Sequence, residues 1–70
     1  MNAAKLHKSD RLQRVHDALD EIRPRWLTTR EIIEQAQVCA VSAAISELRQ
    51  NGARIDCVRE GNVWSYRLAP

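Results

Sequence analysis

The stretch from residue 28 to residue 52 constrains the fold of this 70-residue chain more than any other part of its sequence. Thr28 is followed three positions later by Glu31, a spacing typical of a capping box, which predicts a helix over residues 28–37. A second helix is predicted over residues 41–51, because its apolar residues recur at helical spacing and a glycine follows it directly. Two short helices joined by a tight turn form a helix-turn-helix, a motif that offers its second helix to a partner.

Both helices of this motif have one apolar side that a core can bury. In the first helix this side consists of Ile32, Ile33 and Ala36. In the second helix it consists of Val41, Ala44, Ile45 and Leu48. The other face of the second helix carries small and polar side chains, namely Ser42, Ala43, Ser46, Arg49 and Gln50. The second helix is therefore expected to pack through one face and to leave the other for contacts outside the domain.

Upstream of the motif, the sequence predicts a first, amphipathic helix. Ser9 or Asp10 is a suitable N-cap, and the Arg-Pro step at residues 23–24 ends the helix because the residue before a proline avoids the helical conformation. The apolar stripe of this helix is Leu12, Val15, Ala18, Leu19 and Ile22. After it, Trp26 and Leu27 are candidates for a hydrophobic staple or for an extended segment that pairs with a later strand. We expect Trp26 in the core.

Downstream of the motif, the hydrophobic period changes from helical to alternating. Residues 53–58 and residues 63–68 each alternate, and the glycine-containing residues 59–62 separate them as a turn, which predicts a β-hairpin. Its apolar faces are Ile55 and Cys57 in the first strand and Trp64, Tyr66 and Leu68 in the second. The order of three helices followed by a hairpin predicts an α+β fold of the winged helix-turn-helix type, with the hairpin as the wing.

Length and composition fit one small domain. We expect residues 1–8 to form a flexible basic arm and residues 9–70 to form the winged helix-turn-helix domain. No apolar run approaches the roughly 20 residues of a membrane span. The N-terminus lacks the apolar segment of a signal peptide, so a cytoplasmic protein without a membrane partner is expected. A chain this short buries a limited core, and a homodimer would add stability.

The cysteines and histidines do not form a recognisable catalytic or metal-binding pattern. Cys39 and Cys57 lie far apart without the spacing of zinc ligands, and we expect them as small, reduced, buried thiols. His7 and His16 are distant in sequence from both cysteines, so no pair of nucleophile and base is indicated. Both glycines are expected in a cap and a turn, which leaves no phosphate-binding loop. We therefore expect no enzyme activity, no cofactor and no metal.

Part of the sequence resembles a known class of DNA-binding domains. Residues 41–56, VSAAISELRQNGARID, are similar to the recognition helix and following strand of small winged helix-turn-helix domains from bacteriophages and prophages. The residues that carry the resemblance are Ala43, Ala44, Ile45, Leu48, Arg49, Gly52 and Ile55. The WSYRL run at residues 64–68 is similar to the last strand of the same domains. The resemblance implies binding of double-stranded DNA and a regulatory role.

A DNA-binding protein of this type would use three groups of residues. The N-terminal half of the second motif helix would reach base edges in the major groove, and Arg49 would meet phosphate or a guanine, or else complement the helix dipole. The N-terminus of the first motif helix and the turn of the hairpin would contact phosphates. The candidate DNA-binding residues are Thr28, Thr29, Arg30, Ser42, Ala43, Ser46, Arg49, Gln50, Arg59 and Asn62.

The competing hypothesis is a winged helix that binds a protein, as an adaptor or dimerisation domain. The net charge is only +2, and Ala40 and Ala43 would form an exposed patch suited to a partner helix or a second copy. The placement of charges separates the two hypotheses. DNA binding is favoured if one face gathers the arginines Arg30, Arg49 and Arg59 with the N-terminal lysines. Protein binding is favoured if that face includes the glutamates Glu34, Glu47 and Glu60.

Overall fold

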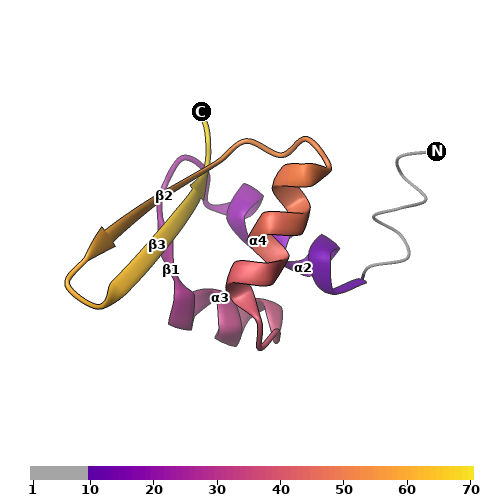
Figure 1. Ribbon diagram of the computed structural model, residues 1–70. Helices are drawn as coiled ribbons and strands as arrows, with labels where there is room; N and C mark the ends of the chain where they lie inside the picture. Colours follow the sequence, from indigo (N-terminus) through magenta and orange to yellow (C-terminus); the bar gives the residue numbers. More distant parts are fainter. Residues whose placement is uncertain (1–9) are drawn as a thin grey trace.

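The computed structural model describes residues 10–70, which form three helices and a three-stranded antiparallel sheet (Figure 1). The helices are α2 (Asp10–Glu21), α3 (Thr29–Ala36) and α4 (Val41–Gln50). The strands are β1 (Leu27–Thr28), β2 (Ile55–Glu60) and β3 (Val63–Leu68). The α+β class expected from the sequence is observed. The predicted arm over residues 1–8 and the alternative N-cap Ser9 lie outside the described residues.

Helix α2 ends slightly before the predicted Arg-Pro stop. Its last helical residue is Glu21, and a turn follows in which the N–H of Arg25 donates to the carbonyl oxygen of Ile22 at 2.8 Å. The predicted apolar stripe is buried at Leu12, Val15, Ala18 and Leu19. The side chain of Arg14 extends from this helix, and its Nε donates to the carbonyl oxygen of Ala36 at 2.7 Å. This hydrogen bond links α2 to the last turn of α3.

The local signals at the ends of α3 and α4 are confirmed. Thr28 Oγ1 accepts a hydrogen bond from the N–H of Glu31 at 3.1 Å, and Glu31 Oε1 accepts one from the N–H of Thr28 at 2.8 Å, which completes the capping box. The C-cap of α3 is Gln37, whose φ of 55° is left-handed and whose N–H donates to the carbonyl oxygen of Ile33. After α4, Gly52 has a φ of 100°, which is the conformation that favours glycine there.

The sheet has the strand order β1-β3-β2, so the segment after α2 pairs with the last strand of the hairpin. Leu27 lies opposite Tyr66, and the extended-segment alternative for this stretch is therefore confirmed. The hairpin strands run further than the sequence suggests. Glu60 pairs with Val63, so only residues 61–62 form the turn, and the predicted four-residue turn was wrong. The glycine of this turn has a φ of 62°, which allows so tight a connection.

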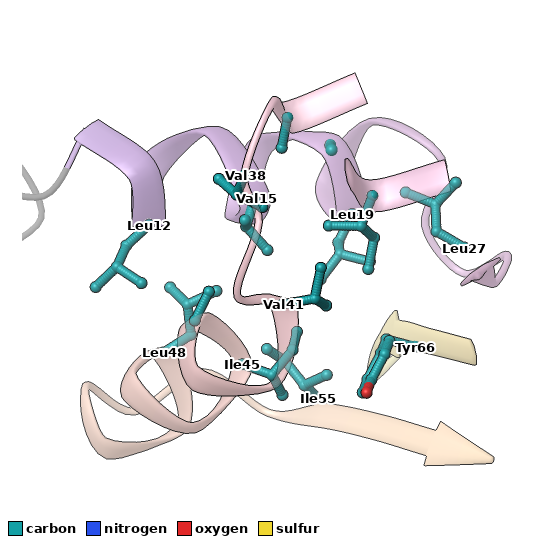
Figure 2. Packing of buried hydrophobic residues seen from close by; sticks show 14 of the residues in the cluster. Leu12, Val15, Leu19, Leu27, Val38, Val41, Ile45, Leu48, Ile55 and Tyr66 are labelled. Carbon is teal, nitrogen blue, oxygen red and sulfur yellow. The ribbon is translucent and has the colours of Figure 1, made fainter. Parts of the chain in front are cut away.

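One hydrophobic core lies between the three helices and the base of the hairpin (Figure 2). Its largest fully buried side chains are Leu19, Ile32, Leu48 and Val15. The predicted apolar side of α4 is buried in full, and Figure 2 shows Val41, Ile45 and Leu48 turned towards the other elements. From the hairpin, the buried residues are Ile55, Tyr66 and Leu68. Helix α2 packs against both α3 and α4, and α3 also packs against β1 and β3.

Two apolar residues expected in the core are exposed. Ile33 is 39% exposed, because the buried side of α3 is formed by Ile32 and Ala36 alone. Trp26 is also 39% exposed, and its ring lies 4.6 Å from the guanidinium carbon of Arg67. This cation–π contact holds Trp26 on the outer face of the sheet, away from the core.

The prediction of two buried thiols was wrong, since Cys39 and Cys57 are both exposed. Cys57 lies on the same face of β2 as the buried Ile55, as alternation requires, but it is further along the hairpin. Figure 1 shows the hairpin turn extending away from the three helices. Cys57 borders an open groove between α4 and the hairpin, so it is not packed into the core. Cys39 belongs to the turn between α3 and α4, where Val38 takes the buried position.

Candidate nucleic-acid interface

Most of the predicted DNA-binding residues line two open grooves against the hairpin. The α4 groove, between α4 and the hairpin, is lined by Thr29, Cys39, Ala40, Val41, Ser42, Ile45, Ser46, Arg49, Cys57, Trp64 and Tyr66. The α3 groove, between the start of α3 and the hairpin turn, is lined by Thr28, Thr29, Arg30, Ile33, Asn62, Val63 and Trp64. Thr29 and Trp64 belong to both grooves, so the two surfaces are continuous.

The exposed side of α4 presents two different faces. Ser42, Ser46 and Arg49 follow one another at steps of four and three residues and line the α4 groove. Ala43 and Gln50 are exposed on the neighbouring face and line neither groove. The face towards the hairpin is therefore made of small hydroxyl side chains, which leave room for a ligand to approach the helix backbone.

The two grooves contain basic but no acidic side chains. Arg49 lines the α4 groove and Arg30 lines the α3 groove, and no aspartate or glutamate lines either. Glu47 is one of the glutamates whose presence on the arginine face would favour protein binding. Its side chain contacts α2 instead, where Oε1 accepts a hydrogen bond from Arg11 Nη2 at 2.7 Å. Glu34 and Glu60 are exposed and line neither groove. A separate groove between α2 and α3 is lined by Asp17, Asp20 and Glu21 together with Arg14.

Arg49 is engaged within the domain. Its Nη2 and Nε donate to the carbonyl oxygen of Ile55 at 2.6 Å and 3.2 Å, which links the last turn of α4 to the first residue of β2. Neither of the predicted uses of Arg49, a DNA contact or a helix-dipole partner, anticipates this bond. The guanidinium nevertheless borders the α4 groove.

The hairpin end of the site is organised around Trp64. Arg59 lies directly opposite Trp64 in the sheet, and its guanidinium carbon is 5.9 Å from the centre of the indole ring. Arg59 Nε also donates to the carbonyl oxygen of Gly61 at 2.8 Å, so the side chain folds back along the turn. Arg59 does not line either groove, but Trp64 borders both.

The start of α3 is attached to the hairpin by one side-chain hydrogen bond. Thr29 Oγ1 donates to the carbonyl oxygen of Trp64 at 3.3 Å. The N–H of Glu31 donates within the capping box. The N–H groups of Thr29 and Arg30 belong to the first turn of α3, where no carbonyl oxygen of the helix is available to accept a hydrogen bond. Thr29 and Arg30 therefore present backbone donors, and Arg30 a charge, at the entrance of the α3 groove.

Trp64 is the site residue that sequence reasoning missed. Alternation places it on the same face as Tyr66 and Leu68, and this pattern indicates burial for all three. Trp64 is 43% exposed, whereas Tyr66 and Leu68 are buried. A usable signal was its distance of only two residues from the turn, because residues near a hairpin turn are the furthest from the core.

Within residues 10–70, no cluster of three or more histidine, cysteine, aspartate or glutamate side chains has the arrangement of a metal site. No helix of this part of the chain has the length and apolar character required to span a bilayer. Comparisons of the chain with protein-family models, with curated proteins and with solved structures found no match.

Proposed function

We propose that this domain is a winged helix-turn-helix that binds double-stranded DNA, and that it acts without catalysis as a small cytoplasmic regulator of the kind found in bacteriophages and prophages. The observation that carries this proposal is the charge of the two continuous grooves, which are lined by Arg30 and Arg49 and by no carboxylate. A polyanion is the ligand that such a surface favours.

In the proposed complex, α4 lies in the major groove. Ser42 and Ser46 lie on the side of α4 that lines the α4 groove of the protein. Their hydroxyl groups can donate to or accept from base edges. Ala43 lies on the adjoining exposed face, where its methyl group suits the methyl group of a thymine. These small side chains allow close approach, and they read sequence less strictly than a bidentate arginine does.

Phosphates are held on both sides of this helix. The backbone donors at the start of α3 and the guanidinium of Arg30 form one anchor, with Asn62 across the α3 groove. Arg59 at the hairpin turn forms the other. A single module of this size buries an area near the lower end of specific protein–DNA interfaces, about 600–1,000 Å². We therefore expect modest affinity from a monomer and tighter binding when two copies occupy neighbouring sites.

The test is an NMR titration of the isotope-labelled domain with a mixed-sequence duplex at low and moderate salt. Shifts are expected at residues 28–30, 41–50 and 59–62, and they should weaken as salt rises because the anchors are ionic. Amides on α2 between Asp17 and Glu21 serve as an internal control, since that surface is acidic. The absence of any shift at low salt would reject DNA binding.

A second candidate function, protein binding, is favoured by one observation. Ile33, Val63 and Trp64 are 39%, 51% and 43% exposed and line the same groove. An exposed group of large apolar side chains is typical of an interaction surface. This group, together with the exposed Ala40 and Ala43, is where a protein partner or a second copy would be sought if the duplex does not bind.

A further inference from the structure

Trp64 combines features that a merely structural residue does not need. It is 43% exposed, although tryptophan has a large apolar surface that is usually buried. It lies where the α4 groove and the α3 groove meet. Its main chain is fixed on both sides, by the strand pair with Arg59 and by the hydrogen bond from Thr29 Oγ1 to its carbonyl oxygen. A large aromatic side chain is thus held in place, partly exposed, where the two grooves meet.

Trp26 offers a comparison within the same domain, because its exposure is similar and its surroundings differ. It is 39% exposed, yet its ring carries the Arg67 guanidinium at 4.6 Å, and that guanidinium also donates from Nε to Asp56 Oδ2 at 3.1 Å. The partners of Trp26 are therefore supplied by the domain itself. Over Trp64, the Arg59 guanidinium carbon stands at 5.9 Å from the ring centre, close to the limit of a cation–π contact. Trp64 lines both the α4 groove and the α3 groove, whereas Trp26 lines neither.

The chemistry of that partner follows from the surroundings of Trp64. Arg30 lines the α3 groove together with Trp64, and Arg59 lies opposite Trp64 in the sheet. In a DNA strand the unit that connects one phosphate to the next and presents an apolar C–H surface is the deoxyribose. An indole accompanied by Arg30 and Arg59, the two proposed phosphate anchors, is matched to this alternation of charge and hydrocarbon.

We propose that Trp64 packs its indole ring against a deoxyribose of the bound DNA strand, between the phosphates held at the start of α3 and the bases faced by α4. This assignment rests on the proposed DNA binding. It makes Trp64 a non-ionic DNA contact, so its contribution to affinity is independent of salt, in contrast to that of Arg30.

The experiment uses two single-tryptophan proteins and a dye-labelled duplex. Trp26→Phe retains only Trp64, and Trp64→Phe retains only Trp26, so each emission reports one ring. Anisotropy of the labelled duplex measures binding separately. On addition of unlabelled duplex, the emission of the Trp26→Phe protein should change, and that of the Trp64→Phe protein should stay constant.

Affinity gives the second readout. Trp64→Ala should weaken binding about tenfold, in the range found when an aromatic nucleic-acid contact is removed, with the same dependence on salt as the unaltered protein. Trp26→Ala, a change of the same residue type at similar exposure, should leave affinity within about twofold. Circular dichroism checks that both variants fold, and the emission measurement on the Trp26→Phe protein does not depend on either of them.

The outcomes separate the two proposals. If the duplex binds while the emission of Trp64 stays constant, the Trp64 contact is wrong and DNA binding stands. If Trp64→Ala lowers the salt dependence, as the loss of a phosphate contact would, the non-ionic assignment is equally wrong. If the duplex does not bind at low salt, DNA binding itself is rejected and the Trp64 contact is rejected with it.

Discussion

The guanidinium of Arg49 donates two hydrogen bonds to the carbonyl oxygen of Ile55, from Nη2 at 2.6 Å and from Nε at 3.2 Å. Arg49 lies in the last turn of α4 and Ile55 opens β2, so the contact spans the loop that joins the helix to the hairpin. It connects α4 and the hairpin, the two elements between which the α4 groove lies. Arg49, expected from the sequence as a DNA contact, is therefore a residue that positions the proposed DNA-binding surface.

Arg49→Ala is expected to lower the free energy of unfolding by about 1 kcal/mol, as for the loss of a typical hydrogen bond, and to weaken duplex binding. The physical reason is a loosened hairpin, since the guanidinium is committed to Ile55. Urea unfolding and salt-dependent anisotropy provide the measurements. Arg49→Lys keeps the charge and loses the two-pronged donor, so full affinity in that variant would show that charge, and not positioning, is what matters.

Arg30→Ala and Arg59→Ala are each expected to lower the slope of log affinity against log salt by about one, because each removes one phosphate contact. Anisotropy titrations of one labelled duplex at several salt concentrations measure the slope. The matched control is Arg25→Ala, which removes the same charge from the segment between α2 and β1, outside both grooves and outside the hairpin turn. A slope identical to that of the control would eliminate the phosphate contact of the arginine concerned.

Thr28→Ala is expected to destabilise the domain by about 1 kcal/mol, the usual cost of losing an N-cap side chain. The lost interaction is the bond from the N–H of Glu31 to Thr28 Oγ1. Thr28→Ser retains the hydroxyl and should remain close to the unaltered protein in urea unfolding. Equal stability of the alanine and serine variants would mean that the capping box contributes nothing measurable to α3.

Both cysteines are expected to react with an aromatic disulfide reagent in the folded protein, because Cys39 and Cys57 are exposed. Absorbance of the released thiolate follows the reaction, and Cys39→Ser and Cys57→Ser separate the two thiols. Saturating duplex should slow both reactions, since both residues line the α4 groove. Reaction only after addition of denaturant would contradict the exposed positions.

The helical part of the fold could be predicted from the sequence because its signals are local. The capping box depends on two residues three positions apart, and the end of α4 depends on the conformational freedom of Gly52. Spacing also predicted the buried side of α4, since a helix repeats its faces at fixed intervals. For Leu27 the sequence left two alternatives open, a hydrophobic staple and an extended segment, and the structure has the second, in which Leu27 pairs with Tyr66.

The candidate site was predictable only in part, because burial along the hairpin depends on how far the helices reach. Alternation groups Ile55 with Cys57 and Tyr66 with Trp64, but it does not say where the core stops. The core stops after Tyr66 and Ile55, so Cys57 and Trp64 become surface residues. The hydrogen bond of Arg49 to a backbone carbonyl could not be predicted either. It depends on which main-chain oxygen lies beside the end of α4, and the spacing of apolar residues does not indicate this.

The half of the hairpin nearest its turn, residues 57–64, affects how the sequence of such a domain can evolve. From residue 57 to residue 64 every side chain is exposed, so none contributes to the core. Apart from Gly61, whose φ of 62° favours glycine, substitutions there leave the free energy of folding nearly unaffected, whereas substitutions at the four buried residues of α4 alter the core. New binding preferences can therefore arise first at the hairpin, where the chain is free to vary in sequence while the helices keep it folded.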